Sequence, residues 1–216
     1  RGPLDRCALL ATLGAMLLAS CTTVPQPDLA ALQLQTEPWP AADALFHREP
    51  RWLGGDAVYS IDLGRDRVLW SFGDSFVATS PAHVRSQSTM VRNSIALQTG
   101  RDVTTATMSF HWRETNDTPS AFFAAPDGTT WYWPAHGARV GDQLLLFLWH
   151  IGAIDTGLGF TGLGWTAVVV PNPDAPPMQW RFEACRTDAL PALALGSSDR
   201  KSTRLNSSHS SVSRMP

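Results

Sequence analysis

Short apolar runs, separated at regular intervals by Gly, Pro, Asp or Asn, dominate the chain from Trp52 onwards. Such runs favour β-strands, and helical periodicity is nearly absent. We expect strands at residues 57–63, 68–72, 94–98, 104–112, 130–133, 138–140, 144–151, 164–170 and 178–182. The run from 144 to 149 is apolar on both faces, which indicates a strand buried on both sides. This even spacing predicts an all-β fold of the sandwich, barrel or propeller type.

The first two predicted strands form a hairpin with an aspartate at each side of its open end. Gly64-Arg65-Asp66 supplies the turn, and a three-residue loop pairs Leu63 with Arg67. Counting along the ladder brings Asp56 opposite Asp74, with Cβ atoms about 4.5–5.5 Å apart. Two carboxylates this close differ in proton affinity, as acid–base catalysis at a glycosidic bond requires. The alternative is that both aspartates only favour turns beside the neighbouring glycines.

Residues 1–20 are interpreted as a lipoprotein signal peptide. The apolar run over residues 7–19 follows two arginines and is too short to span a bilayer comfortably. Leu18-Ala19-Ser20-Cys21 resembles the lipobox of bacterial lipoproteins, in which the cysteine is diacylated. We therefore expect an extracytoplasmic, lipid-anchored protein of the bacterial cell envelope, at the outer membrane or cell surface, that contacts the membrane through Cys21. The alternative is an ordinary secretory signal with an incidental cysteine.

Composition divides the rest of the chain into three segments. Residues 21–51 are rich in Ala, Pro and Gln and predict a tether, whereas residues 52–198 carry the strand pattern and predict the folded domain. Residues 199–216 are interpreted as the translation of a sequencing-library adapter, because residues 199–209 match its coding sequence and Lys201 is the only lysine in the chain. A genuine basic, disordered C-terminus is the alternative.

Charge and motif content exclude several classes of function. Between residues 21 and 198, seventeen Asp and Glu outnumber eleven Arg, and no basic stripe occurs, so nucleic acid is not an expected partner. No CxxC pair or Cys/His cluster suggests a metal, and we expect no cofactor. The glycines at 157, 159 and 162 match a dinucleotide-binding pattern, but a predicted strand follows them instead of the helix that would hold a pyrophosphate.

Two further segments carry candidate glycan-binding residues. Arg92 is suited to orient a substrate hydroxyl or pair with an aspartate, and Asn93 to position a sugar hydroxyl; an ion pair and a turn cap are the structural alternatives. Trp131 and Trp133 predict a surface on which sugar rings stack, with core packing as the alternative. His136, placed on the following turn, is suited to carry a proton near neutral pH, although an exposed turn histidine is the simpler interpretation.

Several of these segments together resemble one bacterial family. They are residues 54–60, with the motif GGD; 68–76, with FGD; 92–94; 131–134; 140–142; and 172–174. Over about residues 52–183 they resemble the family catalogued as domain of unknown function 4185, with its relative 5005. The resemblance implies a five-bladed β-propeller related to furanosidases, of which this chain holds the first two to three blades, and an acidic pair at Asp56 and Asp74. Many relatives are acidic after the Trp-Pro pair, where this chain has Ala135-His136.

The leading hypothesis is a lipid-anchored glycoside hydrolase that acts on a furanoside-containing, arabinan-type polysaccharide. Asp56 is the expected general base or nucleophile and Asp74 its partner carboxylate, and the sequence leaves open which of them is the acid. Arg92 and Asn93 are expected to orient the substrate on the aromatic strip. The alternatives are a non-catalytic carbohydrate-binding protein and a structural envelope lipoprotein.

Overall fold

The computed structural model describes residue 33 and residues 35–185. The predicted signal peptide, Cys21, most of the tether's first half and the segments 186–198 and 199–216 lie outside the described residues. Among the described residues, no helix is long and apolar enough to cross a membrane.

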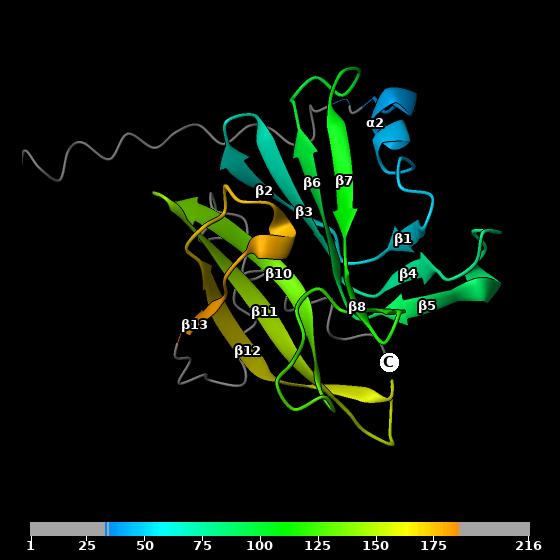
Figure 1. Ribbon diagram of the computed structural model, residues 1–216, viewed down its shortest axis with the longest axis vertical. Coiled ribbons are helices and arrows are strands. Elements are labelled where there is room, and N and C mark those ends of the chain that lie inside the picture. Colours follow the sequence, from blue (N-terminus) through cyan, green and yellow to red (C-terminus); the bar gives the residue numbers. More distant parts are fainter. Residues whose placement is uncertain (1–32, 34, 186–216) are drawn as a thin grey trace, which may run out of the picture. The chain divides into compact units, whose positions relative to one another are not determined.

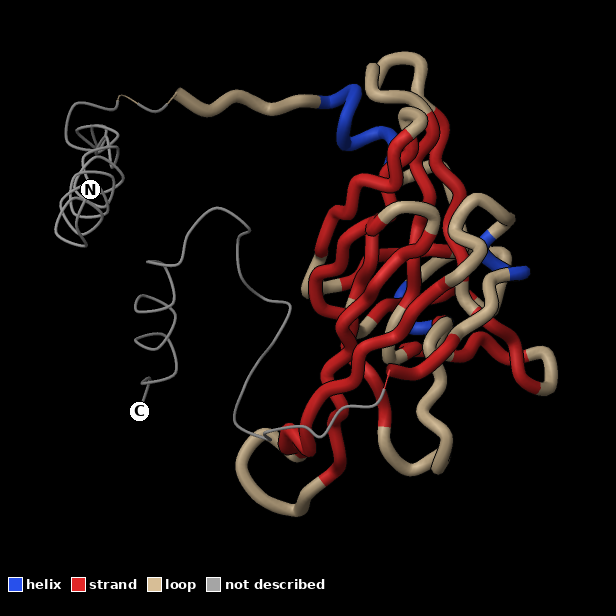
Figure 2. Tube along the Cα trace, turned by 90° about the vertical axis from the view of Figure 1, so that its left-hand side faces the viewer, coloured by secondary structure: helices blue, strands red, loops and turns tan. Residues whose placement is uncertain are grey.

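The described part of the chain is all-β, as predicted, and its strands form antiparallel sheets (Figures 1 and 2). One four-stranded sheet has the order β2-β3-β6-β7 and a second has the order β10-β11-β12-β13. The first consists of β2 (Tyr59–Gly64), β3 (Arg67–Phe72), β6 (Ser94–Thr99) and β7 (Thr107–His111). The second consists of β10 (Trp131–Val140), β11 (Gln143–Ala153), β12 (Phe160–Val170) and β13 (Glu183–Cys185).

Smaller elements surround these two sheets. A three-stranded sheet of order β1-β4-β5 contains β1 (Trp52–Gly55), β4 (Ser75–Ala78) and β5 (Ser88–Val91). The hairpin of β8 (Arg113–Thr115) and β9 (Thr118–Ser120) links the two large sheets in sequence. The helical segments are short (Figure 2): α2 (Pro40–Leu45) and the 3-10 turns η2 (Arg85–Gln87) and η3 (Pro177–Gln179).

The main core lies between the two four-stranded sheets. Alternate residues of the first sheet, among them Ile61, Leu69 and Ile95, pack with Leu146 and Val168 of the second. Strand β2 lies against β10, so the first strand of one sheet meets the first strand of the other. The period-two pattern of the sequence therefore directs one face of each sheet into a shared apolar layer.

Helix α2 lies in the segment predicted to be a tether, and it belongs to the folded domain. Pro40 at its first position suits a helix start. Leu45 is only 1% exposed and packs in a second core with Trp52, Phe72 and Phe110, on the other face of the first sheet. The folded domain therefore begins about twelve residues earlier than predicted, at Pro40 rather than Trp52.

The first hairpin has the predicted register but a shorter turn. Its loop contains two residues, Arg65 and Asp66, both in the left-handed region with φ of 52° and 56°. An irregularity between Asp62 and Gly64 offsets the missing loop residue, so that Asp62 still lies opposite Val68.

Other strand boundaries differ from the prediction. The expected strands 130–133 and 138–140 are one continuous strand, β10, with a bulge between Pro134 and Gly137. His136 is therefore part of a strand, whereas the sequence predicted that it lies on a turn. The expected strand 178–182 is absent; η3 and the three residues of β13 occupy this region. A bulge interrupts the alternation on which strand prediction depends.

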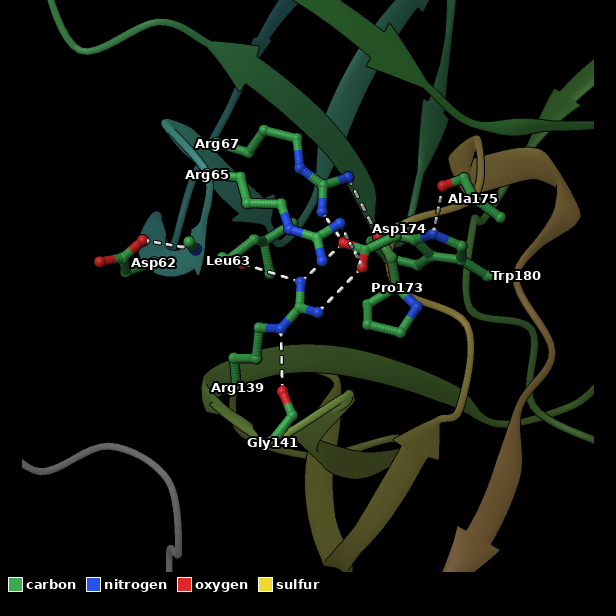
Figure 3. A network of polar contacts seen from close by, with 11 residues as sticks. Asp62, Leu63, Arg65, Arg67, Arg139, Gly141, Pro173, Asp174, Ala175 and Trp180 are labelled. Carbon is green, nitrogen blue, oxygen red and sulfur yellow. Dashed lines mark hydrogen bonds and ion pairs between the residues drawn. The ribbon is translucent and has the colours of Figure 1, made fainter.

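Asp174 connects the two large sheets at the ends of β3 and β10. It accepts hydrogen bonds from Arg139, at 2.7 and 3.0 Å, and from Arg65 and Arg67, and Arg139 also donates to the carbonyl of Leu63 at 2.9 Å (Figure 3). The hydrogen bonds from Arg139 and the charges of the three arginines hold the pKa of Asp174 far below its usual range. This cluster links the turn of the first sheet to the second.

Shortening the side chain of Leu45 by substitution tests whether α2 is part of the fold. We expect Leu45→Ala to lower the free energy of unfolding by about 2–5 kcal/mol, because it opens a cavity in the second core. Leu158, which is 84% exposed, provides the matched control, and Leu158→Ala should change stability by less than about 0.5 kcal/mol. Equal denaturant midpoints for the two variants would contradict the inclusion of α2 in the fold.

Candidate functional site

The two aspartates lie where the chain passes from one sheet to another. Gly55 of β1 pairs with Ser75 of β4 in the three-stranded sheet, whereas β2 and β3 pair in the first four-stranded sheet. Asp56 and Asp74 occupy the gap between these two ladders.

Backbone hydrogen bonds carry the ladder across this gap. The Asp56 N–H donates to the Asp74 carbonyl at 3.2 Å, and the Gly73 N–H donates to the Asp56 carbonyl at 2.8 Å. Asp56 thus faces Gly73 and Asp74 together, and the hairpin brings the two aspartates close, as its register predicts. Ala57, in the left-handed region with φ of 47°, turns the chain into β2.

Both aspartates line an open cleft of about 650 Å³. Residues 53–55 of β1 line this cleft together with residues of the segment formed by β4, η2 and β5. The side chains that matter for chemistry are those of Asp56, Asp74, Phe76, His83, Arg85 and Met90. A cleft of this volume is in the range that accommodates small ligands or a few units of a polymer.

Asp74 is held by two donors from different segments, β10 and the bend between β5 and β6. The Trp133 indole Nε1 donates to Oδ1 at 2.9 Å, and the Arg92 guanidinium donates to Oδ2 at 3.3 Å. Arg92 itself lies over the ring of Trp131, with 4.0 Å from Cζ to the ring centroid, which is a close cation–π contact. Arg92, Trp131 and Trp133 thus fix the orientation of one carboxylate.

Asp56 occupies a different environment from Asp74. Burial, followed by the negative charge of Asp74, raises the pKa of Asp56 above its ordinary value. Gly73 makes this placement sterically possible, since a Cβ added there would lie 2.5 Å from Oδ1 of Asp56. Asp56 therefore holds its proton more tightly than an ordinary aspartate does, and it lies beside a carboxylate that is paired with Arg92.

A buried chain of hydrogen bonds supports the backbone around Asp74. The Ser75 hydroxyl donates to the Gly73 carbonyl at 2.9 Å and lies 2.8 Å from the Ser94 hydroxyl, which accepts from the Trp52 indole at 3.0 Å. Satisfied networks of this kind in a buried setting restrict local motion.

Asn93 does not lie in the cleft, contrary to its predicted role in substrate binding. Its exposed fraction is 0%. Nδ2 donates to the carbonyls of Phe123 and Tyr132 at 3.0 and 2.8 Å, and Oδ1 accepts from the Phe123 N–H at 2.7 Å. The side chain connects the loop before β10 to the first sheet, so its role in the structure is internal.

The predicted aromatic strip is divided between two settings. Trp131 is buried and covered by Arg92, so it presents no open ring face to a sugar. Trp133 is partly exposed, and its ring meets Phe160 edge-on at 4.8 Å between centroids. His136 lies on the bulge of β10 and packs edge-on against Tyr59, with ring centroids 6.2 Å apart. Of the strip, Trp133 is the residue that reaches a carboxylate of the site.

Sequence reasoning missed His83 and Arg85 as residues of the cleft. They lie in a segment of short strands and turns without a clear apolar period, so no motif marked them, and Phe76 was noted only as the end of the segment 68–76. Among the described residues, no three His, Cys, Asp or Glu side chains gather closely enough to hold a metal ion.

The fold and the site define an all-β protein built from antiparallel four-stranded sheets, with paired aspartates in an open cleft beside an arginine and a tryptophan. The chain belongs to the family described as domain of unknown function (DUF5005), whose profile matches residues 41–190. The match begins within α2, in agreement with the structural start of the domain.

Comparison with solved structures supports the fold. The chain is similar to the crystal structure of a candidate hydrolase from Bacteroides ovatus ATCC 8483, with a TM-score of 0.52 and 20% sequence identity. The similarity covers 74% of this chain and 48% of that protein, so the chain spans about half the length of its structural relative. No protein of curated function matches the chain.

The pKa of Asp56 provides a test of the site's electrostatics. We expect Asp74→Asn to lower the pKa of Asp56, because the neighbouring negative charge is removed while burial, the largest cause of the raised pKa, is unchanged. Carboxyl carbon chemical shifts followed by NMR titration measure this directly. Asp66→Asn, a substitution in the hairpin turn, is the control and should leave the titration of Asp56 unchanged; an unchanged Asp56 in Asp74→Asn would show that the two carboxyl groups do not interact.

Proposed function

We propose that the protein is a glycoside hydrolase that acts on a furanoside-containing, arabinan-type polysaccharide. The observation that carries this proposal is the pairing of Asp56 and Asp74 across the ladder junction, in two contrasting environments within one cleft. A pair of carboxyl groups whose proton affinities differ is the arrangement that glycosidic bond hydrolysis uses.

The environments favour a specific division of roles. Asp56, with its raised pKa, is the general acid that gives a proton to the leaving-group oxygen. Asp74, fixed by Arg92 and Trp133, is the carboxylate that acts as base or nucleophile at the sugar carbon. This assignment is the reverse of the one expected from the sequence, where Asp56 was the base or nucleophile. The exposed part of Trp133 and the ring of Phe160 supply apolar surface for a sugar ring beside Asp74.

One comparison and one feature of the fold agree with this proposal without defining a substrate. The similarity to a candidate hydrolase extends over most of this chain. The two four-stranded meanders, with β2 against β10, also suit two successive blades of a propeller. We therefore propose that the domain forms part of a five-bladed propeller whose remaining blades would complete the cleft's surroundings.

We also propose that the protein is attached to the cell envelope through a lipid on Cys21, as the lipobox-like segment 18–21 indicates. In a bacterial host, Cys21→Ser should move the protein from the membrane fraction to the soluble fraction and abolish labelling by a radioactive fatty acid. Cys185→Ser is the matched control and should leave both unchanged. Membrane attachment that survives Cys21→Ser would contradict the anchor.

Substitution of the paired aspartates tests the catalytic proposal. Asp56→Asn and Asp74→Asn should each lower the rate of polysaccharide cleavage by about 10²–10⁴-fold, because each removes an acid or base from the reaction. For wild type, activity should fall as the pH rises through the pKa of Asp56, since the general acid must be protonated. Release of reducing ends measures both effects.

Two glycine substitutions separate catalysis from a loss of folding. Gly73→Ala keeps both carboxyl groups but displaces that of Asp56, so cleavage should fall while glycan binding persists. Gly162→Ala, where an added Cβ meets nothing within 4 Å, is the matched control. Glycan binding with no cleavage in wild type, insensitive to Asp74→Asn and lost on Trp133→Ala, would instead support a non-catalytic carbohydrate-binding protein.

A further inference from the structure

The cleft that Asp56 lines also contains an arginine with no acidic partner. Among the described residues, no carboxylate lies within ion-pair distance of Arg85, and its guanidinium donates no hydrogen bond to the protein. Most other arginines of this part are engaged; Arg92, for example, bonds to Asp74. Arg85 is the arginine that lines the cleft.

Phe76 holds the Arg85 side chain in place. The guanidinium carbon lies 3.8 Å from the centroid of the Phe76 ring, and both residues line the cleft. Stacking occupies a face of the planar group and leaves its edge, which carries the N–H donors, free for a ligand. The fork of donors at this edge matches the oxygens of a carboxylate, sulfate or phosphate.

The charges of the cleft determine where in it an anionic group of a ligand can bind. Asp56 and Asp74 repel an anionic substituent, whereas Arg85 attracts it to the segment between β4 and β5. His83, which adopts the left-handed backbone region with φ of 49°, lines the same cleft. These charges favour one orientation for a substrate that carries an acidic group.

We propose that Arg85, stacked on Phe76, binds an anionic substituent of the polysaccharide next to the bond that is cleaved. The substrate class is then an acidic glycan rather than a neutral one. This inference rests on the proposed function, because it takes the cleft of Asp56 and Asp74 to be the glycan site.

The test uses one polysaccharide with different substituents. Arabinan carrying succinate half-esters and arabinan carrying sulfate esters present an anion, whereas arabinan carrying acetate esters at equal density is neutral. We expect the full chain to bind at least one anionic form about tenfold more tightly than the acetylated form in isothermal titration calorimetry. The succinylated and sulfated forms distinguish a carboxylate from a sulfate as the preferred group.

Three variants test whether Arg85 causes the preference for anionic polysaccharide. Arg85→Gln should abolish the preference for the anionic forms, and Phe76→Leu should reduce it, because the guanidinium loses its stacking partner. Arg48→Gln removes an equal charge from an exposed arginine that does not line the cleft, and it should retain the preference. Since the Arg85 side chain makes no hydrogen bond or ion pair, its substitution should leave the fold intact.

The outcomes separate this inference from the proposed function. Equal affinity for charged and neutral forms, or a preference that survives Arg85→Gln or is lost in Arg48→Gln, would overturn the inference. If the acetylated form is still cleaved in an Asp56-dependent manner, the proposed function holds even though the inference about Arg85 is overturned. If no form binds, both are overturned.

Discussion

Two backbone hydrogen bonds, from Asp56 to Asp74 and from Gly73 to Asp56, hold together the junction on which the rest of the site depends. They join two ladders that belong to different sheets but share one register. If this junction opened, the three-stranded sheet would separate from the first four-stranded sheet, and the two carboxyl groups would move with them. Gly73 is needed at the same point, since a side chain there would collide with Asp56. The proposed chemistry therefore depends on backbone geometry before it depends on any side chain.

Buried polar side chains make this junction rigid. Asn93 uses its amide to connect the first sheet to the segment that precedes β10, and the Trp52–Ser94–Ser75 chain supports the backbone at Gly73. Leaving any of these buried groups without a partner would cost its full desolvation energy, which favours a single arrangement. Asn93 thus influences the position of Trp133, and through it Asp74, although it does not line the cleft.

The sequence was sufficient for the all-β class and for the register that brings Asp56 to Asp74, because both depend on alternation and on a turn signal between neighbouring strands. It was not sufficient where distant segments meet. The burial of Asn93 depends on Phe123 and Tyr132, thirty or more positions away. The bulge that places His136 within β10 interrupts the strand pattern, and the burial of α2 depends on a sheet formed later in the chain. Non-local packing decided each of these points.

The order of the strands separates the paired aspartates from the residues that surround the ligand. β4 and β5 are inserted between β3 and β6, and they form a separate sheet in which β4 pairs with both β1 and β5. Arg85 and Phe76 lie on this insertion, whereas Asp56 and Asp74 are fixed by the ladder junction itself. Substitutions on the exposed surface of the insertion can therefore change which substituent is bound without disturbing the carboxyl pair. Among the described residues, the strands of the first four-stranded sheet make no hydrogen bond to the turn between β4 and β5. Substitutions in this turn can therefore alter ligand preference with the smallest loss of stability.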